Sequence, residues 1–336
     1  MKRRDAVLVP LALAGTGLPL GVSAQAHNAG KPYRIALLPD LGGMGPGVLK
    51  EFTEALREAG RNEGRDYVLI RSGLEYGPSF DVLVKRALDA NPDLIVSGGT
   101  PSARPIQKLM PTVPVVLWGG GFPIQAGIVD SLAHPGRSVT GITAYADTAI
   151  LGKYLQLLRD AKPGIKRVGV ILSQVPPVFL REEIDHAIRQ YLEGARQLKL
   201  NVRIMEAAEP EDVDTAIAKL GADAVDALVL PVGRAVALRA SKLLEFSAQR
   251  RLPVLTDIRW AGSDPLPLLS YGAPFPALVR QAAGYVDRIL WGGAKPGDLP
   301  MQQPTKFELV INLKTAKALG ITIPQSLLLR ADEVIQ

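Results

Sequence analysis

A turn with the features of an anion-binding helix start lies at Thr100, which is followed by Pro101 and Ser102. A hydroxyl residue next to a proline is typical of a first helical turn, where unpaired backbone N–H groups and the positive end of the helix dipole favour an anion. We therefore predict that this turn, with Gly99, contacts the carboxylate of a small molecule. The structural alternative is that Thr100 simply caps its own helix.

Charges elsewhere in the chain could complete a site for a zwitterion. Arg234, preceded by Gly233, could pair with an acidic group, and Asp40 or Asp257 could receive an ammonium group. Taken singly, each of these charges also fits a solvated loop.

Four of the eighteen aromatic residues follow predicted strands closely. They are Trp118, Phe122, Trp260 and Tyr271. Rings at such positions predict an apolar or aromatic wall for a bound molecule. For Trp118, packing in a hydrophobic core is an equal alternative.

The glycine-rich turn 42–47 contains Met44, follows a predicted strand and opens a predicted helix. Its spacing does not fit a dinucleotide-binding motif, because Val48 stands where the third glycine should be. The turn could let backbone amides approach a ligand, or it could be a tight connection between strand and helix.

Catalytic and metal-binding constellations are hard to assemble from this sequence. Of the three histidines, His27 falls in the N-terminal part, His134 in a Pro-Gly turn and His186 on the polar side of a predicted helix. A Ser/His/Asp triad is therefore not expected. No group of acidic residues or histidines has the spacing of metal ligands. The acidic pair Glu182-Glu183 is explained by the start of a helix, where negative charges are favourable. We predict no catalytic residue, no metal and no cofactor.

An internal repeat indicates how the chain positions these residues. Residues 34–38 (RIALL) return as 167–171 (RVGVI), and 93–97 (DLIVS) return as 226–230 (DALVL), in both cases 133 residues later. Apolar strands alternate with amphipathic helices in each copy, which predicts an α/β fold of two similar, Rossmann-like lobes with parallel sheets.

Ligands of such sheets collect beyond the carboxyl ends of the strands, so the loops at those ends predict the site. The lobes should face each other across a cleft at these loops. The predicted loops are 39–47, 98–104 and 118–124 from the first copy, and 173–177, 231–236 and 256–261 from the second.

The first 26 residues resemble an export signal. Three basic residues precede an apolar stretch from Ala6 to Val22, and small residues suit cleavage after Ala24 or Ala26. A membrane anchor needs about 20 apolar residues, whereas this stretch is shorter and contains prolines and glycines. The Arg3-Arg4 pair leaves the general and the twin-arginine export routes both open. We expect a periplasmic protein.

Composition excludes several classes of site. There is no cysteine, and therefore no disulfide, thiolate metal site, cysteine nucleophile or lipid-attachment cysteine. Loss of residues 1–26 removes three basic residues and one acidic residue, which lowers the formal net charge from +6 to +4. Basic residues are scattered among acidic ones, so we expect no nucleic-acid partner.

The C-terminal region resembles a known family. Residues 303–320 (QPTKFELVINLKTAKALG), followed by Ile323-Pro324 and 330–333 (RADE), are similar to the signature of the substrate-binding proteins of ABC transporters related to the tryptophan and tyrosine binders. Further similar segments are 52–64, Gly99-Thr100-Pro101, 131–141 and Ser270-Tyr271-Gly272.

This resemblance implies a type I periplasmic-binding-protein fold with three hinge crossings, near 144–148, 271–274 and 296–304. Lobe I would comprise 32–144 and 272–298, and lobe II 145–271 and 299–336. Lobe I would include the helix 276–291, and lobe II would include the strand 307–311. The family's binding loops map onto Thr100 and its neighbours, Ser173-Gln174 and Tyr271.

The resemblance also implies a function: a monomeric receptor that clamps a small molecule, an amino acid or an aromatic or carboxylate compound, by hinge closure and delivers it to an ABC permease. The chain has Gly121-Phe122-Pro123 where relatives often have Gly-Asp-Pro, and Ser173-Gln174 where many have an asparagine-rich turn. Both changes could alter the ligand. The alternatives are a periplasmic ligand sensor for a receptor and, less favoured, an exported hydrolase using Asp257 with a serine.

Overall fold

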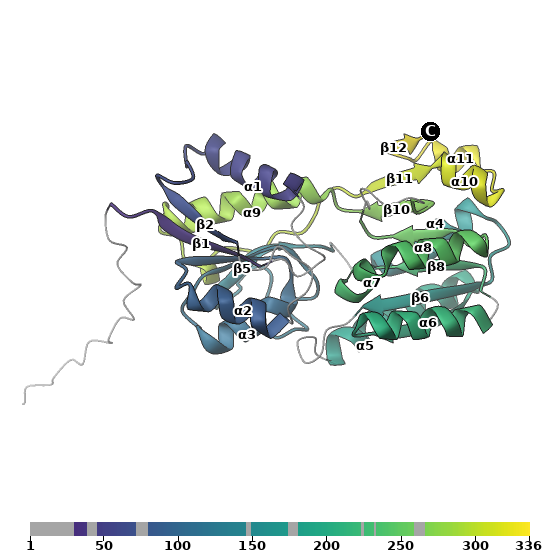
Figure 1. Ribbon diagram of the computed structural model, residues 1–336, viewed down its shortest axis with the longest axis horizontal. Helices are drawn as coiled ribbons and strands as arrows, with labels where there is room; N and C mark the ends of the chain where they lie inside the picture. The colour runs from purple at the N-terminus through teal and green to yellow at the C-terminus, as the bar shows by residue number, and fades with distance from the viewer. Residues whose placement is uncertain are drawn as a thin grey trace, which may run out of the picture.

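The computed structural model describes residues 30–38, 46–71, 80–145, 149–173, 181–222, 225–231, 233–258 and 266–336. These residues form two β-sheets with helices packed against them, and the two resulting lobes lie side by side (Figure 1). The predicted α/β class with two lobes is confirmed. The export signal expected at residues 1–26 lies outside the described residues.

Lobe I contains a five-stranded parallel sheet in the order β2-β1-β3-β4-β5. Its strands are β1 (Tyr33–Leu38), β2 (Tyr67–Arg71), β3 (Leu94–Ser97), β4 (Val115–Gly120) and β5 (Val139–Thr143). Successive side chains of β1 point to opposite faces, so Ile35 and Leu37 enter one core and Ala36 and Leu38 the other. The sheet is therefore buried on both sides, as parallel sheets usually are.

Helices cover both faces of this sheet. One core contains side chains of α1 (Pro46–Glu58) and α9 (Phe275–Leu290), and the other those of α2 (Phe80–Asp89) and α3 (Thr100–Leu109). Although α9 is separated in sequence from the other helices of lobe I by much of the second lobe, it lies beside α1 in lobe I (Figure 1).

Lobe II contains a seven-stranded sheet in the order β12-β11-β10-β9-β8-β6-β7. Its strands are β6 (Arg167–Ser173), β7 (Asn201–Ala207), β8 (Ala227–Leu230), β9 (Val254–Thr256), β10 (Leu269–Gly272), β11 (Glu308–Asn312) and β12 (Glu333–Ile335). One pair departs from the parallel pattern, because Glu308 pairs with Gly272 and the chain thus enters β11 at the carboxyl end of β10.

The helices of lobe II also pack on two sides. One core draws on α4 (Ala149–Ala161), α5 (Arg181–Leu198), α10 (Leu313–Leu319) and α11 (Gln325–Leu328). The other draws on α6 (Pro210–Ala222), α7 (Arg234–Leu238) and α8 (Ala240–Gln249).

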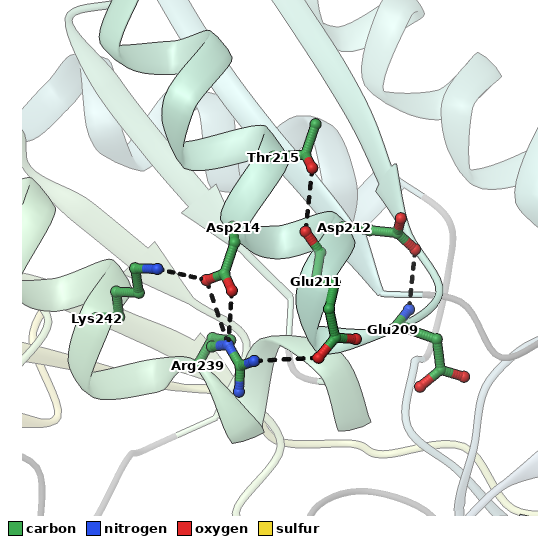
Figure 2. Close-up of polar contacts among 7 residues, drawn as sticks. All are labelled: Glu209, Glu211, Asp212, Asp214, Thr215, Arg239 and Lys242. Carbon is green, nitrogen blue, oxygen red and sulfur yellow. Dashed lines mark hydrogen bonds and ion pairs between the residues drawn. The ribbon is translucent and has the colours of Figure 1, made fainter.

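An ion-pair network on lobe II fixes α7 and α8 against α6 (Figure 2). Asp214 lies 3.3 Å from the Nε atom of Arg239 and 2.8 Å from the Nζ atom of Lys242, and Arg239 also reaches Glu211 at 3.4 Å. Arg239 separates α7 from α8. The network therefore helps to place the first turn of α7, whose Ala235 N–H donates to Ser173 at the end of β6.

The chain passes between the lobes in three places: after β5, after β10 and after the 3-10 turn η1 (Pro296–Asp298). The third passage is attached to lobe I by backbone pairing of Gln302 with Ile142 and by a 2.7 Å hydrogen bond from Thr140 Oγ1 to the Leu299 carbonyl. The carboxyl ends of both sheets consequently meet between the lobes.

Candidate functional site

A cavity of about 150 Å³ lies between the lobes, at the carboxyl ends of their strands. Lobe I lines it with the first turn of α3, the end of β4 and the start of α9, and lobe II with the ends of β6 and β9 and the first two turns of α5. Among the predicted site residues, those that line the cavity are Gly99, Thr100, Pro101, Phe122, Ser173 and Asp257.

The first turn of α3 is arranged differently from the predicted helix cap. Gly99 is the N-cap residue, with extended backbone and no side-chain cap. The Thr100 hydroxyl, 2% exposed, instead donates to Glu183 Oε1 at 3.3 Å. Ser102 is buried behind the turn, where it hydrogen-bonds with the hydroxyl of Ser97, and it does not line the cavity.

Glu183 was not predicted as a site residue. The pair Glu182-Glu183 does lie in the first turn of α5, as predicted for a helix start, but the two side chains differ in their surroundings. Glu182 is exposed, whereas Glu183 is 3% exposed and lines the cavity from the first turn of α5. A signal was present in the sequence, because Glu183 precedes Ala187 and Tyr191 at intervals of four and shares their face of the helix. Its contact with Thr100 joins lobe II to lobe I.

Asp257 supplies a second buried carboxylate, 8% exposed, directly after β9. The Tyr145 hydroxyl donates to its Oδ2 atom at 3.3 Å. Burial, and then the charge of Asp257, raise the pKa of Tyr145 well above its usual value, so this phenol stays protonated as a donor. Gly272 permits this arrangement, because a Cβ atom there would lie 1.7 Å from the Asp257 carbonyl oxygen.

Tyr154 brings a third polar group to the cavity from α4. Its side chain is fully buried, and its hydroxyl has no hydrogen-bond partner within the described parts of the chain. Burial raises the pKa of Tyr154 well above the usual phenol value. A buried hydroxyl in this situation can bond with a bound molecule.

Aromatic rings form a wall, but not with all the predicted residues. Phe122 stacks on Tyr145 with ring centroids 5.4 Å apart, and Phe275 completes the lining from α9. Trp118 agrees with its core-packing alternative: it is 1% exposed and packs against Phe52 and Phe275 in the core of lobe I, because its strand is buried on both faces.

Tyr271 also lies away from the cavity lining, contrary to prediction. Its ring packs edge-on against Tyr154, with centroids 6.4 Å apart, and in a tilted arrangement against Phe307, with centroids 5.8 Å apart, since its side chain points to the core of lobe II. Tyr271 therefore packs behind Tyr154, which itself lines the cavity.

His186 differs from its predicted position on the polar side of a helix. Its ring lies edge-on to Phe122 at 5.1 Å, and its Nε2 atom is buried. Burial, aided by nearby Arg189, lowers the pKa of His186. The imidazole is thus neutral at pH 7 and adds no positive charge beside the cavity.

Ser173 and Gly233 form a fixed contact in lobe II. Ser173 Oγ accepts the Ala235 N–H at 3.0 Å, and a Cβ atom at Gly233 would lie 2.5 Å from the Ser173 Cβ atom. Gly233 is buried behind Ser173 and does not line the cavity. Met44, Gln174, Asp40, Trp260 and the Arg234 side chain lie outside the described residues.

The charge of the cavity wall is one-sided. Its described lining includes the carboxylates of Glu183 and Asp257 and no lysine, arginine or histidine. Across the described ranges, no cluster of three histidine, aspartate or glutamate side chains could hold a metal ion. Nor does any helix in those ranges have the length and apolar character required to cross a membrane.

Comparison with known families gives one match over most of the chain. The family described as ABC transporter substrate binding protein matches residues 47–335. Among curated proteins, a tyrosine-binding protein from Clostridioides difficile is 24% identical over 275 residues, which are 81% of this chain and 76% of that protein.

Solved structures share the fold. A conserved domain protein from Vibrio cholerae aligns with a TM-score of 0.79 and 24% identity, over 90% of this chain and all of that one. An ABC domain from Streptococcus pneumoniae in complex with L-tryptophan aligns with a TM-score of 0.77 and 22% identity, over 91% of this chain and all of that one. The two lobes thus have the type I periplasmic-binding-protein fold.

Proposed function

The chain belongs to the family of ABC transporter substrate-binding proteins. We therefore propose that it captures a small molecule between its lobes and delivers it to an ABC permease. The observation that carries the proposal is the inter-lobe cavity, whose wall combines two buried carboxylates, a buried phenol and aromatic rings. A set of a few polar groups on an apolar wall is typical of small-molecule sites.

Hinge closure supplies the mechanism. Residues 32–144 with 272–298, and 145–271 with 299–336, act as two rigid bodies joined by the three passages. A ligand that contacts both bodies stabilises the closed arrangement by its differential affinity for the two states. The Thr100–Glu183 contact supports this mechanism, because it already joins the two rims of the cavity.

The family and its relatives guide the choice of test ligands. The two relatives named for tyrosine and tryptophan make aromatic compounds of amino-acid size the first set to test. The aromatic wall of Phe122, Tyr145 and Phe275 supports the same size and shape class.

We place the mature protein in the periplasm as a monomer, after cleavage behind Ala24 or Ala26. The basic start and apolar stretch of residues 1–26 support this placement. N-terminal sequencing of the exported protein tests the cleavage site.

The deciding experiment combines native mass spectrometry of the purified protein with small-angle X-ray scattering. A retained small molecule, released chemically unchanged, and a smaller radius of gyration on its re-addition are expected. Release of a converted product would favour an enzyme, and an unchanged radius of gyration at saturation would contradict hinge closure.

A further inference from the structure

We propose that Tyr154 determines which ligand the cavity accepts. Its hydroxyl group donates a hydrogen bond to a hydroxyl oxygen of an aromatic ligand, and an analogue that lacks this oxygen binds more weakly. The inference rests on the proposed capture function and names the chemical class of the molecule captured.

The hydroxyl of Tyr154 is a donor without an acceptor in the described parts of the chain. Tyr154 lines the cavity from α4, its side chain is fully buried, and its Oη atom has no hydrogen-bond partner among the described residues. Burial raises the pKa of Tyr154 well above its usual value, so the O–H group keeps its proton at pH 7. Burial of a polar group without a hydrogen bond is unfavourable, so a ligand oxygen that accepts this proton gains affinity over an apolar group in its place.

The other hydroxyl groups of the described lining already have partners. Thr100 and Tyr145 each donate to a carboxylate at 3.3 Å, and the Oγ atom of Ser173 accepts a backbone N–H at 3.0 Å. Within the lining that the structure describes, Tyr154 is therefore the hydroxyl residue that the fold leaves available to a ligand.

The core of lobe II fixes the position of this hydroxyl. The Tyr154 ring lies edge-on to Tyr271, with centroids 6.4 Å apart, in the core that α4 and α5 share. Two residues before Tyr154, the two helices approach closely, because a Cβ atom on Gly194 would lie 2.6 Å from the Cα atom of Gly152. Close packing keeps the ring from turning its hydroxyl towards another partner. A donor held in one direction discriminates between molecules with and without the matching oxygen.

The rest of the lining favours an aromatic body and a neutral oxygen. The rings of Phe122, Tyr145 and Phe275 form a wall on which an aromatic molecule can pack. Aliphatic side chains add to the lining: Leu172, Ile184, Ala187, Ile258 and Leu278.

A buried oxygen that carries a negative charge needs a positively charged partner, and the described lining contains no lysine, arginine or histidine. A phenolic hydroxyl is neutral at pH 7, and its oxygen can accept the proton of Tyr154.

Pairs of molecules that differ by one hydroxyl group test the proposal by isothermal titration calorimetry on the purified protein. The pairs are tyrosine with phenylalanine, tyramine with phenethylamine, and 4-hydroxyphenylacetate with phenylacetate, so that zwitterions, cations and anions are all represented. The hydroxylated member of at least one pair should bind more tightly than its partner by about fivefold or more. A smaller preference, or the opposite one, in every pair that binds overturns the proposal.

Tyr154→Phe assigns the preference to the hydroxyl group. In this variant the two members of the discriminating pair should bind within about twofold of each other, because the hydroxylated member loses its donor and its partner loses nothing. The measured quantity is a ratio of two affinities for one variant, so a general change in stability or closure cancels from it. A preference that survives in Tyr154→Phe overturns the proposal.

Tyr191→Phe is the matched control. Tyr191 is also fully buried in the same core, and its hydroxyl also has no partner within the described ranges, but Tyr191 does not line the cavity. The preference for the hydroxylated member should therefore be the same as in the wild type. An equal loss of preference in both variants would show that the core causes it and not a contact with the ligand, and the proposal would then fail.

Native mass spectrometry separates failure of this inference from failure of the capture function. If no pair binds but another small molecule is retained, the assignment to Tyr154 and a hydroxylated ligand fails while the capture function stands. If no pair binds and no small molecule is retained, both fail.

Discussion

At the scale of single residues, Gly272 is required by the backbone of Asp257. A Cβ atom at position 272 would lie 1.7 Å from the Asp257 carbonyl oxygen, so β10 or the Asp257 segment must move to accept any side chain. Asp257 lines the cavity, and its displacement would therefore alter the site.

We expect Gly272→Ala to lower the free energy of unfolding by about 1–3 kcal/mol through steric overlap, and to weaken ligand binding. Urea denaturation and calorimetry measure the two effects. Gly284→Ala is the matched control: this glycine lies inside α9 with no atom within 4 Å of an added Cβ. The control should gain about 0.5–1 kcal/mol, since alanine favours helix. Equal stabilities of the two variants would contradict the steric argument.

Asp226 gives a pH dependence whose sign follows from its partners. The Arg167 guanidinium, aided by the backbone N–H groups of Lys166 and Arg167, lowers the pKa of Asp226 from 3.8 to about 2. A carboxyl whose pKa is lower in the folded state stabilises the protein above its unfolded value and loses that contribution as the pH falls from 3.8 towards 2.

We expect Asp226→Asn to cost about 0.5–1 kcal/mol at pH 7, after allowing for solvent screening of this partly exposed pair. The difference from the wild type should shrink progressively as the pH falls from 3.8 to about 2, because the wild-type carboxyl becomes protonated over this range. Thermal unfolding between pH 2 and pH 7 checks this. A difference that stays constant across the range would show that the effect is not electrostatic.

The sequence predicts which loops form the site better than it predicts which side chains of those loops point into the cavity. Strand and helix periodicity located the loops that carry Thr100, Ser173 and Asp257, because ligands of parallel sheets bind at strand ends. Trp118 lies in a strand that is buried on both faces, and the half-buried Tyr271 packs against the core of lobe II. Hydrophobicity alone therefore gave no sign of which aromatic side chains line the cavity.

At the scale of elements, the internal repeat predicted two neighbouring strands of each sheet, β1 with β3 and β6 with β8. Residues 34–38 and 167–171 occupy β1 and β6, which lie next to β3 and β8 in equivalent positions. The edge strand β12 has only three residues and no recognisable pattern of its own. Its place is set by pairing with β11, a tertiary contact that a local pattern does not encode.

Helices α4 and α5 meet at a pair of glycines. A Cβ atom on Gly194 would lie 2.6 Å from the Cα atom of Gly152, which shows how closely the two backbones approach. This contact positions α5, and with it Glu183, over the cavity.

We expect Gly194→Val to cost about 1–3 kcal/mol, because the two helices must separate. The same variant should weaken ligand binding through displacement of Glu183. Leu192→Ala on the same helix serves as the control, because Leu192 is 49% exposed and its loss should change stability little. Chemical denaturation of both variants checks the difference, and a tolerated valine would disprove the close approach.

At the scale of the whole molecule, the two lobes meet through a contact that opening would break. Thr100 belongs to α3 of lobe I and Glu183 to α5 of lobe II, so their hydrogen bond exists only while the rims of the cavity are together. Under the proposed hinge closure, its free energy contributes to the equilibrium between open and closed states and not to the stability of either lobe.

We expect Thr100→Val to leave the melting temperature nearly unchanged while shifting this equilibrium towards the open state. Loss of a hydrogen bond to a charged acceptor should make the free energy of closure less favourable by about 1.5–3 kcal/mol. A smaller fraction of the protein is then closed, and the apparent ligand affinity falls in proportion to that fraction. Scattering should show a larger radius of gyration than for the wild type at the same subsaturating ligand concentration. Ser131→Ala, on an exposed turn of the same lobe, should show neither effect. If Thr100→Val lowers the melting temperature but leaves affinity and compaction unchanged, the contact stabilises a lobe and takes no part in closure.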